Sequence, residues 1–142
     1  MALALRVIGS KAKWYDQDWL APGEATADIV SDFKTSDNKL SVYYIENEEE
    51  LQRVAVAITR GRKNVQNFDY VLLEESDLVS LGIEVRNAEG ATNDEVVNGW
   101  HRDLEKLTAS KLLDLVRAYK TSSSVEGHLG RILEGKLKKL LS

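Results

Sequence analysis

The tripeptide His101–Asp103 carries an imidazole, a guanidinium and a carboxylate, side chains that acid–base catalysis uses. In phosphotransfer enzymes with a His-Arg-Asp loop, the Asp accepts the proton of the substrate hydroxyl, and an Asn five positions later holds a metal ion. That later position is Thr108 here, and the chain has no Asp-Phe-Gly metal motif. Trp100 and Leu104 lie one helical turn apart around the tripeptide, a spacing that predicts an exposed flank of an amphipathic helix instead.

A second pattern that would support catalysis is a pair of carboxylates, Asp69 and Glu84, each within or beside an apolar segment of strand type. Metal-dependent nucleases and phosphodiesterases place two such carboxylates on neighbouring strands, where both bind one Mg²⁺ and a nearby lysine assists the attacking water. Arg86 stands where that lysine would be, and a guanidinium does not give up its proton. An edge strand with exposed charges is the alternative explanation.

Other catalytic and cofactor-binding motifs are missing from the sequence. There is no cysteine and there are only two histidines, so thiol nucleophiles and zinc–thiolate sites are excluded. No phosphate-binding glycine motif and no nucleophile-elbow motif is present. We therefore expect no metal, no cofactor and no catalytic residue.

Three aromatic residues, Trp14, Tyr15 and Trp19, lie within six positions of one another in a stretch that ends at Pro22 and Gly23. One interpretation is that they cover the core beside the end of a strand. The other is a partner-binding surface, because Trp and Tyr dominate the energetics of protein interfaces. We include all three among the candidate partner-binding residues.

The elements that would position these residues divide the chain into two parts. Residues 1–91 predict a mixed α/β part, with strands over 3–8, 39–45, 68–73 and 83–86 and helices over 24–33, 48–60 and 76–81. Asn47 and Glu50 have the spacing of a helix N-terminal capping box. The strand–helix–strand order of 39–73 predicts a βαβ unit with parallel strands, and hence a small mixed sheet of three to four strands.

Residues 92–142 predict a helical part packed on one face of that sheet, so that the whole is a single α+β domain over 1–142. Helix starts are predicted at Thr92, Thr108 and Ser123. The last predicted helix spans 125–141 and contains three glycines that weaken it by about 1 kcal/mol each. Its apolar stripe, formed by Leu129, Ile132, Leu133 and Leu137, therefore predicts a partner surface or a self-association seam. Packing of the stripe on the sheet of its own domain is the alternative.

Composition and charge limit the classes of function. The 142 residues are 43% hydrophobic and 30% charged, which fits one folded domain, and no apolar run approaches the roughly 20 residues of a membrane span. The first residues lack the features of a signal peptide, so we expect a cytoplasmic protein. The net charge is −4, and residues 121–142 carry a local surplus of cations, four basic residues against two glutamates. Nucleic-acid binding is therefore not expected, except through the C-terminal tail alone.

These observations predict a small acidic cytoplasmic protein that acts by binding another protein or a second copy of itself, more consistent with a non-enzyme than with an enzyme. An antitoxin, immunity-type or accessory component of a bacterial system has this size and acidity. The alternative from a different class is the metal-dependent nuclease or phosphodiesterase that would use Asp69 and Glu84.

Overall fold

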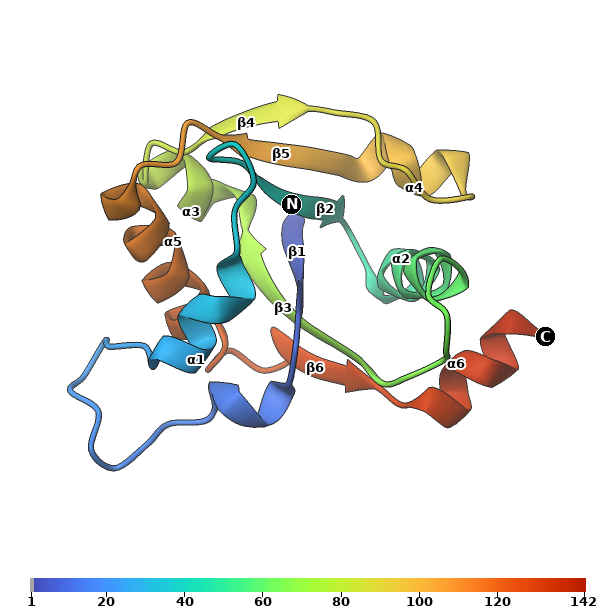
Figure 1. Cartoon of the computed structure of the whole chain (residues 1–142), viewed down its shortest axis with the longest axis horizontal. Coiled ribbons are helices and arrows are strands. Elements are labelled where there is room, and N and C mark those ends of the chain that lie inside the picture. The colour runs from blue at the N-terminus through green and yellow to red at the C-terminus, as the bar shows by residue number, and fades with distance from the viewer. Residues whose placement is uncertain (1) are drawn as a thin grey trace.

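The computed structural model describes residues 2–142, which form a six-stranded sheet with helices on both faces (Figure 1). The strands are β1 (Leu3–Ile8), β2 (Leu40–Ile45), β3 (Phe68–Glu74), β4 (Glu84–Asn87), β5 (His101–Glu105) and β6 (Leu129–Ile132). The α-helices are α1 (Ala27–Val30), α2 (Glu48–Arg60), α3 (Glu75–Ser80), α4 (Glu95–Trp100), α5 (Ala109–Ser122) and α6 (Glu134–Leu141). Two 3-10 helices, η1 (Lys11–Trp14) and η2 (Ser31–Phe33), complete the described elements.

The strand order is β4-β5-β2-β1-β3-β6, and every neighbouring pair is antiparallel. The α+β class is confirmed, although the sheet has six antiparallel strands where a mixed sheet of three to four was expected. The predicted βαβ unit is present as β2, α2 and β3. Both strands pair with β1, which lies between them and runs opposite to each, so β2 and β3 are parallel to one another without being neighbours.

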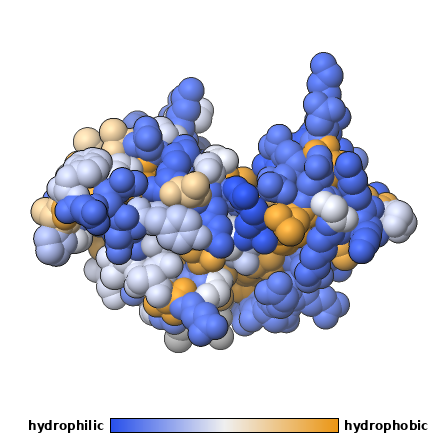
Figure 2. All heavy atoms as spheres, turned by 90° about the horizontal axis from the view of Figure 1, so that it is seen from below, coloured by the Kyte–Doolittle hydropathy of each residue, from blue (hydrophilic) through white to orange (hydrophobic). Residues whose placement is uncertain are grey.

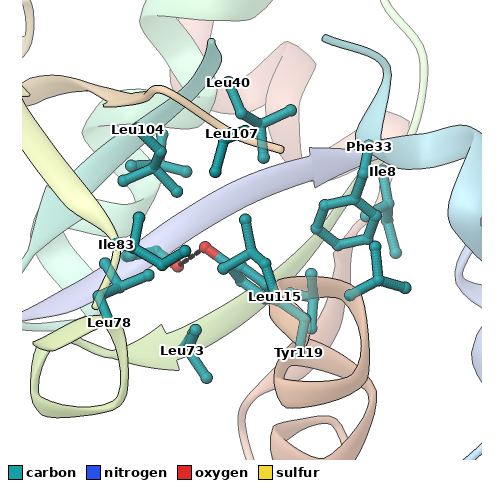
Figure 3. Close-up of a cluster of buried hydrophobic side chains, with 14 of the residues drawn as sticks. Ile8, Phe33, Leu40, Leu73, Leu78, Ile83, Leu104, Leu107, Leu115 and Tyr119 are labelled. Carbon is teal, nitrogen blue, oxygen red and sulfur yellow. Dashed lines mark hydrogen bonds between the residues drawn. The ribbon is translucent and has the colours of Figure 1, made fainter. Parts of the chain in front are cut away.

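Side chains of the central strand β1 point alternately to the two faces of the sheet, and each face has its own hydrophobic core. Ala4 and Ile8 face a first core, whereas Leu5 faces a second core on the opposite face of the sheet. The first core is closed by α1, η2, α3 and α5, and the second by α2, α4 and α6. Figure 3 shows Tyr119 of α5 reaching into the first core, where its hydroxyl donates a 3.0 Å hydrogen bond to the carbonyl oxygen of Ala4.

The prediction of a helix through the His-Arg-Asp tripeptide is wrong. Helix α4 ends at Trp100, and His101–Glu105 form β5, between β4 and β2. Leu104 is buried opposite Leu40 in the first core, so the apolar spacing that resembled a helix comes from one strand residue that follows a short helix. The expected cap at Thr92 is also wrong, because Asp94 caps α4 by accepting hydrogen bonds from the amides of Val96 and Val97.

The prediction of one continuous helix over residues 125–141 is wrong as well. This segment contains a turn, the edge strand β6 and the short helix α6, and Ser123 starts no helix. Gly130 lies opposite Tyr70 of β3, where a Cβ would overlap the hydroxyl group of Tyr70. Residues 92–142 therefore supply two strands and three helices, and their helices cover both faces of the sheet instead of one.

The helix caps predicted at Asn47 and Thr108 are confirmed. The side chain of Asn47 accepts a 2.9 Å hydrogen bond from the amide of Glu50 at the start of α2. The Glu50 carboxylate reaches back to the amide of Glu46, one residue before the cap, at 2.8 Å. Thr108 caps α5 by accepting from the amide of Lys111 at 3.1 Å. Caps of this kind depend only on residues three or four positions apart, which is why the sequence reveals them.

Candidate partner-binding site

A cavity lies between the 15–24 loop and the C-terminal end of α5. Its volume is about 580 Å³, within the range of ordinary ligand and peptide pockets. Trp14, Tyr15 and Leu129 line it together with Lys120 and the loop residue Leu20. We call this feature the aromatic groove. Two segments from opposite ends of the sequence, the aromatic loop and β6, are thus brought together in one site.

Trp14 forms the fixed wall of the aromatic groove. It is almost fully buried and packs against Phe33, with the ring centroids 5.8 Å apart. Its Nε1 donates a 3.0 Å hydrogen bond to Oδ2 of Asp32, while the other carboxylate oxygen of Asp32 accepts from the amide of Gly9 at 2.9 Å. A buried indole whose N–H is satisfied in this way is held in one orientation.

Lys120 joins the 15–24 loop to α5. Its Nζ donates a 2.9 Å hydrogen bond to the carbonyl oxygen of Trp14 and a 2.7 Å hydrogen bond to Oδ1 of Asp16. The hydrogen bond and the positive charge of Lys120 hold the pKa of Asp16 below its ordinary value. At neutral pH the loop is therefore tied to the helix by a charged hydrogen bond at the rim of the groove.

Two of the three aromatic residues are exposed. Tyr15 and Trp19 have 55% and 74% of their surface accessible. Lys11 lies 5.9 Å from the centroid of the Tyr15 ring. In Figure 2, pale residues gather on the side of the molecule that carries the 15–24 loop, and the surface is hollowed between this side and the lobe over α6. An exposed Trp on a loop offers a large contact area to a partner.

The remaining predicted partner-binding residues do not form one surface. Ile132 and Leu137 are buried in the second core, and Leu129 lines the aromatic groove. Of the four, only Leu133 is strongly exposed, at 60%. The predicted stripe is split because β6 alternates its side chains between the two faces of the sheet, while Leu133 stands between β6 and α6.

Asp69 and Glu84, the carboxylates of the alternative nuclease hypothesis, lie far apart. Three strands separate β3 from β4, which corresponds to roughly 19 Å at the usual strand spacing. Asp69 is buried and bound by Arg131, and Glu84 lies 3.2 Å from the Nζ of Lys106 on the opposite edge. The two carboxylates therefore cannot bind one ion, and the hypothesis that joined them is wrong.

His101 and Arg102 of the His-Arg-Asp tripeptide are engaged in structural contacts. Nδ1 of His101 donates to the carbonyl oxygen of Ala88 at 2.8 Å, and its ring meets Tyr43 edge-on at 5.2 Å. The Arg102 guanidinium lies 5.0 Å from the centroid of the Tyr44 ring. These contacts anchor β5 to its neighbours and to the loop before α4.

A serine–histidine pair, which the sequence did not reveal, lies at the end of α5. Oγ of Ser122 is 2.8 Å from Nδ1 of His128 and donates its hydrogen to the carbonyl oxygen of Leu72 at 2.6 Å. Since the hydroxyl has one hydrogen, Nδ1 of His128 must be the donor to Oγ. The histidine in this state does not act as a base toward the serine, and the pair fastens the turn before β6 to β3.

No group of three His, Asp or Glu side chains within residues 2–142 is placed to hold a metal ion. Over the same residues, no helix has the length and apolar character needed to cross a bilayer. Comparisons of the chain with family models, with curated proteins and with solved structures found no match.

Proposed function

We propose that the protein acts by binding another protein in the aromatic groove. The observation that supports this most directly is the position of two exposed aromatic residues, Tyr15 and Trp19, on the loop that borders a cavity of about 580 Å³ with a fixed indole wall. Interfaces gain most of their energy where an apolar side chain enters such a cavity and exposed aromatic rings close over it. The partner segment would supply the apolar side chain.

The polar groups of the groove favour binding over chemistry. The hydroxyl groups of Ser123 and Ser124 donate to backbone carbonyl oxygens of α5, and the Lys120 ammonium is bound to Asp16. Among the residues that line the groove, none pairs a free nucleophile with a general base, which acyl or phosphoryl transfer to the protein would require.

A cytoplasmic setting and a role in a bacterial antitoxin or immunity-type pair extend this proposal. They rest on the chain length of 142 residues, the net charge of −4 and the absence of cysteine, which fits a reducing compartment. A second copy of the chain is the other partner that the proposal includes, which would make the protein a homodimer.

The test compares capture by the wild type, a Trp19→Ala variant and a Val79→Ala variant. Trp19 and Val79 are equally exposed, at 74% each, so neither change should disturb the core. A partner retained by the wild type and Val79→Ala but lost by Trp19→Ala supports the proposal, and its affinity is then measured with purified proteins. A partner retained equally by all three, or a loss equal in both variants, contradicts binding through the aromatic loop that borders the groove.

A further inference from the structure

Six cations gather at one corner of the molecule, where α2 ends and α6 begins. Arg60, Arg62 and Lys63 belong to the end of α2 and the loop after it, and α6 adds Lys136, Lys138 and Lys139. With Glu134 as the one carboxylate in these two segments, the corner has a surplus of five positive charges in a chain whose net charge is −4. We call these six side chains the basic ridge.

Packing brings the two halves of the basic ridge together. Leu137 of α6 is buried in the second core, which α2 also closes. The amide of Glu134, the first residue of α6, donates a 2.8 Å hydrogen bond to Oδ1 of Asn67 in the loop after α2. Figure 1 shows this loop passing directly beside α6, and Figure 2 shows the lobe over α6 as largely hydrophilic. The C-terminal cations are thus extended by a basic segment from the middle of the chain.

Most of the ridge is not neutralised by the protein itself. Lys138 lies 3.9 Å from Glu134 of the same helix, whereas the other five cations have no carboxylate within ion-pairing distance among residues 2–142. By contrast, most cations elsewhere on the sheet and on α5 are paired or bound to carbonyl oxygens. Unpaired cations on one surface attract a polyanion.

The acidic residues of α2 lie at its other end. Glu48, Glu49 and Glu50 form the first turn of this 13-residue helix, and Arg60 is its last residue. At 1.5 Å per residue the two ends are about 18 Å apart, roughly twice the Debye length at physiological ionic strength. Salt therefore screens the ridge from these carboxylates. Two carboxylates, Asp94 and Glu95, line the same hollow as Arg60. Asp94 is bound by Arg53, so Glu95 is the carboxylate that stays exposed there.

A hollow beside the ridge has groups suited to an unpaired base. It has a volume of about 370 Å³, and Tyr43, Asn93 and Arg62 are among the residues that line it. Thr92 also lines it, but its hydroxyl is already hydrogen-bonded to Asn98. Aromatic rings stack on bases, and amide and guanidinium groups hydrogen-bond to base edges that are free only in single strands. A carboxylate would also pair with the Arg62 guanidinium, but an acidic side chain has no ring to stack on Tyr43.

We propose that the basic ridge binds the phosphodiester backbone of single-stranded nucleic acid, with an unpaired base in the hollow beside Arg62. Contact with about four phosphates gives a dependence of log affinity on log salt with a slope of about −3. Raising the salt concentration from 50 to 200 mM should then weaken binding about 50-fold. The ridge is distinct from the aromatic groove, so Trp19→Ala should leave this binding unchanged.

The test uses fluorescence anisotropy with labelled single-stranded DNA and RNA of mixed sequence. Two charge-reversal variants, Arg60→Glu with Lys63→Glu and Lys136→Glu with Lys139→Glu, should each lower affinity about 10-fold or more. The control variant, Lys34→Glu with Arg117→Glu, has the same net charge but changes cations outside the ridge, and its affinity should stay within about 2-fold of the wild type. Melting curves establish that every variant is folded.

Four results would overturn the proposal. They are no binding of either strand at 50 mM salt, an equal loss in the control variant, tighter binding of a duplex than of the single strand, and displacement of the oligonucleotide by polyglutamate at equal charge concentration. The last result would assign the ridge to an acidic protein partner instead.

Discussion

Asp69 and Arg131 form a two-point salt bridge across β3 and β6, with Nε of Arg131 2.7 Å from Oδ1 and Nη2 2.9 Å from Oδ2. The amide of Lys11 donates a further 2.8 Å hydrogen bond to Oδ2. One buried carboxylate therefore joins the edge strand, its neighbour and the 3-10 helix that leads into the aromatic loop. Asp69 therefore has a structural role.

Replacing Asp69 by Asn should destabilise the protein by about 1–3 kcal/mol at pH 7. The loss stays below that of a fully buried pair because 36% of the Arg131 side chain is exposed to solvent. Burial by itself would raise the pKa of Asp69, but the hydrogen bonds and charges of Arg131 and Lys11 lower it below its ordinary value. Urea denaturation of both proteins gives the difference in the free energy of unfolding.

The same pair predicts a dependence on pH. A carboxylate with a lowered pKa contributes stability above its unfolded-state pKa of about 4 and loses that contribution as the pH falls through the lowered value. The difference between the wild type and Asp69→Asn should therefore shrink below pH 4. A difference that stays constant down to pH 2 would show that the charge of Asp69 is not what stabilises β6.

Tyr119→Phe tests the polar contact inside the first core. The change removes the hydroxyl that donates to the carbonyl oxygen of Ala4, and with it a hydrogen bond inside the first core. We expect a loss of about 1–2 kcal/mol. Tyr15→Phe is the control, because Tyr15 is exposed, and it should change the melting temperature very little. Equal effects of the two substitutions would contradict the burial of the Tyr119 hydroxyl.

Two glycines near the C-terminus distinguish the observed strand and short helix from one continuous helix. Gly130→Ala would force a methyl group into Tyr70 and should cost about 1–3 kcal/mol, whereas Gly135→Ala on α6 meets open space and should stabilise by up to about 1 kcal/mol. In a continuous helix both changes would stabilise. Thermal melts of the two variants separate these cases, and Tyr70→Leu should relieve part of the Gly130→Ala penalty.

The success of the sequence predictions depended on how local the determining interactions are. Strand β1 was predicted from its own apolar alternation, β2 from its β-branched and aromatic residues, and α2 from the cap at Asn47. Strands β5 and β6 were missed because their apolar residues fall at helical spacing with those of the flanking segments. Their pairing partners, including Leu40 opposite Leu104, lie far away in the sequence.

The same argument applies to the candidate site. The exposed aromatic loop was identified from residue types alone, since Trp and Tyr outside a periodic element are conspicuous. Its contact with Leu129 was not predictable, because the two segments meet only after β6 joins the sheet beside β3. The basic ridge was missed for a related reason, since Arg60–Lys63 and α6 lie at separate places in the sequence.

Lys120→Met should loosen the loop that borders the aromatic groove. The change keeps the length of the side chain but removes both hydrogen bonds from Nζ, to the carbonyl oxygen of Trp14 and to Asp16. Amide hydrogen exchange over residues 15–24 should become faster, while the amides of β1 and β3 keep their protection. Lys111→Met on the same helix removes a bond to the carbonyl oxygen of Gly82 instead and serves as the control.

The Lys120 contact also predicts a response to pH in the wild-type loop. Because the hydrogen bond from Lys120 lowers the pKa of Asp16, the contact is complete above the ordinary carboxylate pKa of about 4 and is lost as the pH falls through the lowered value. A pH titration followed by tryptophan fluorescence should show this loss in the wild type and in Lys111→Met but not in Lys120→Met. A transition of equal size in all three proteins would mean that another group controls the loop.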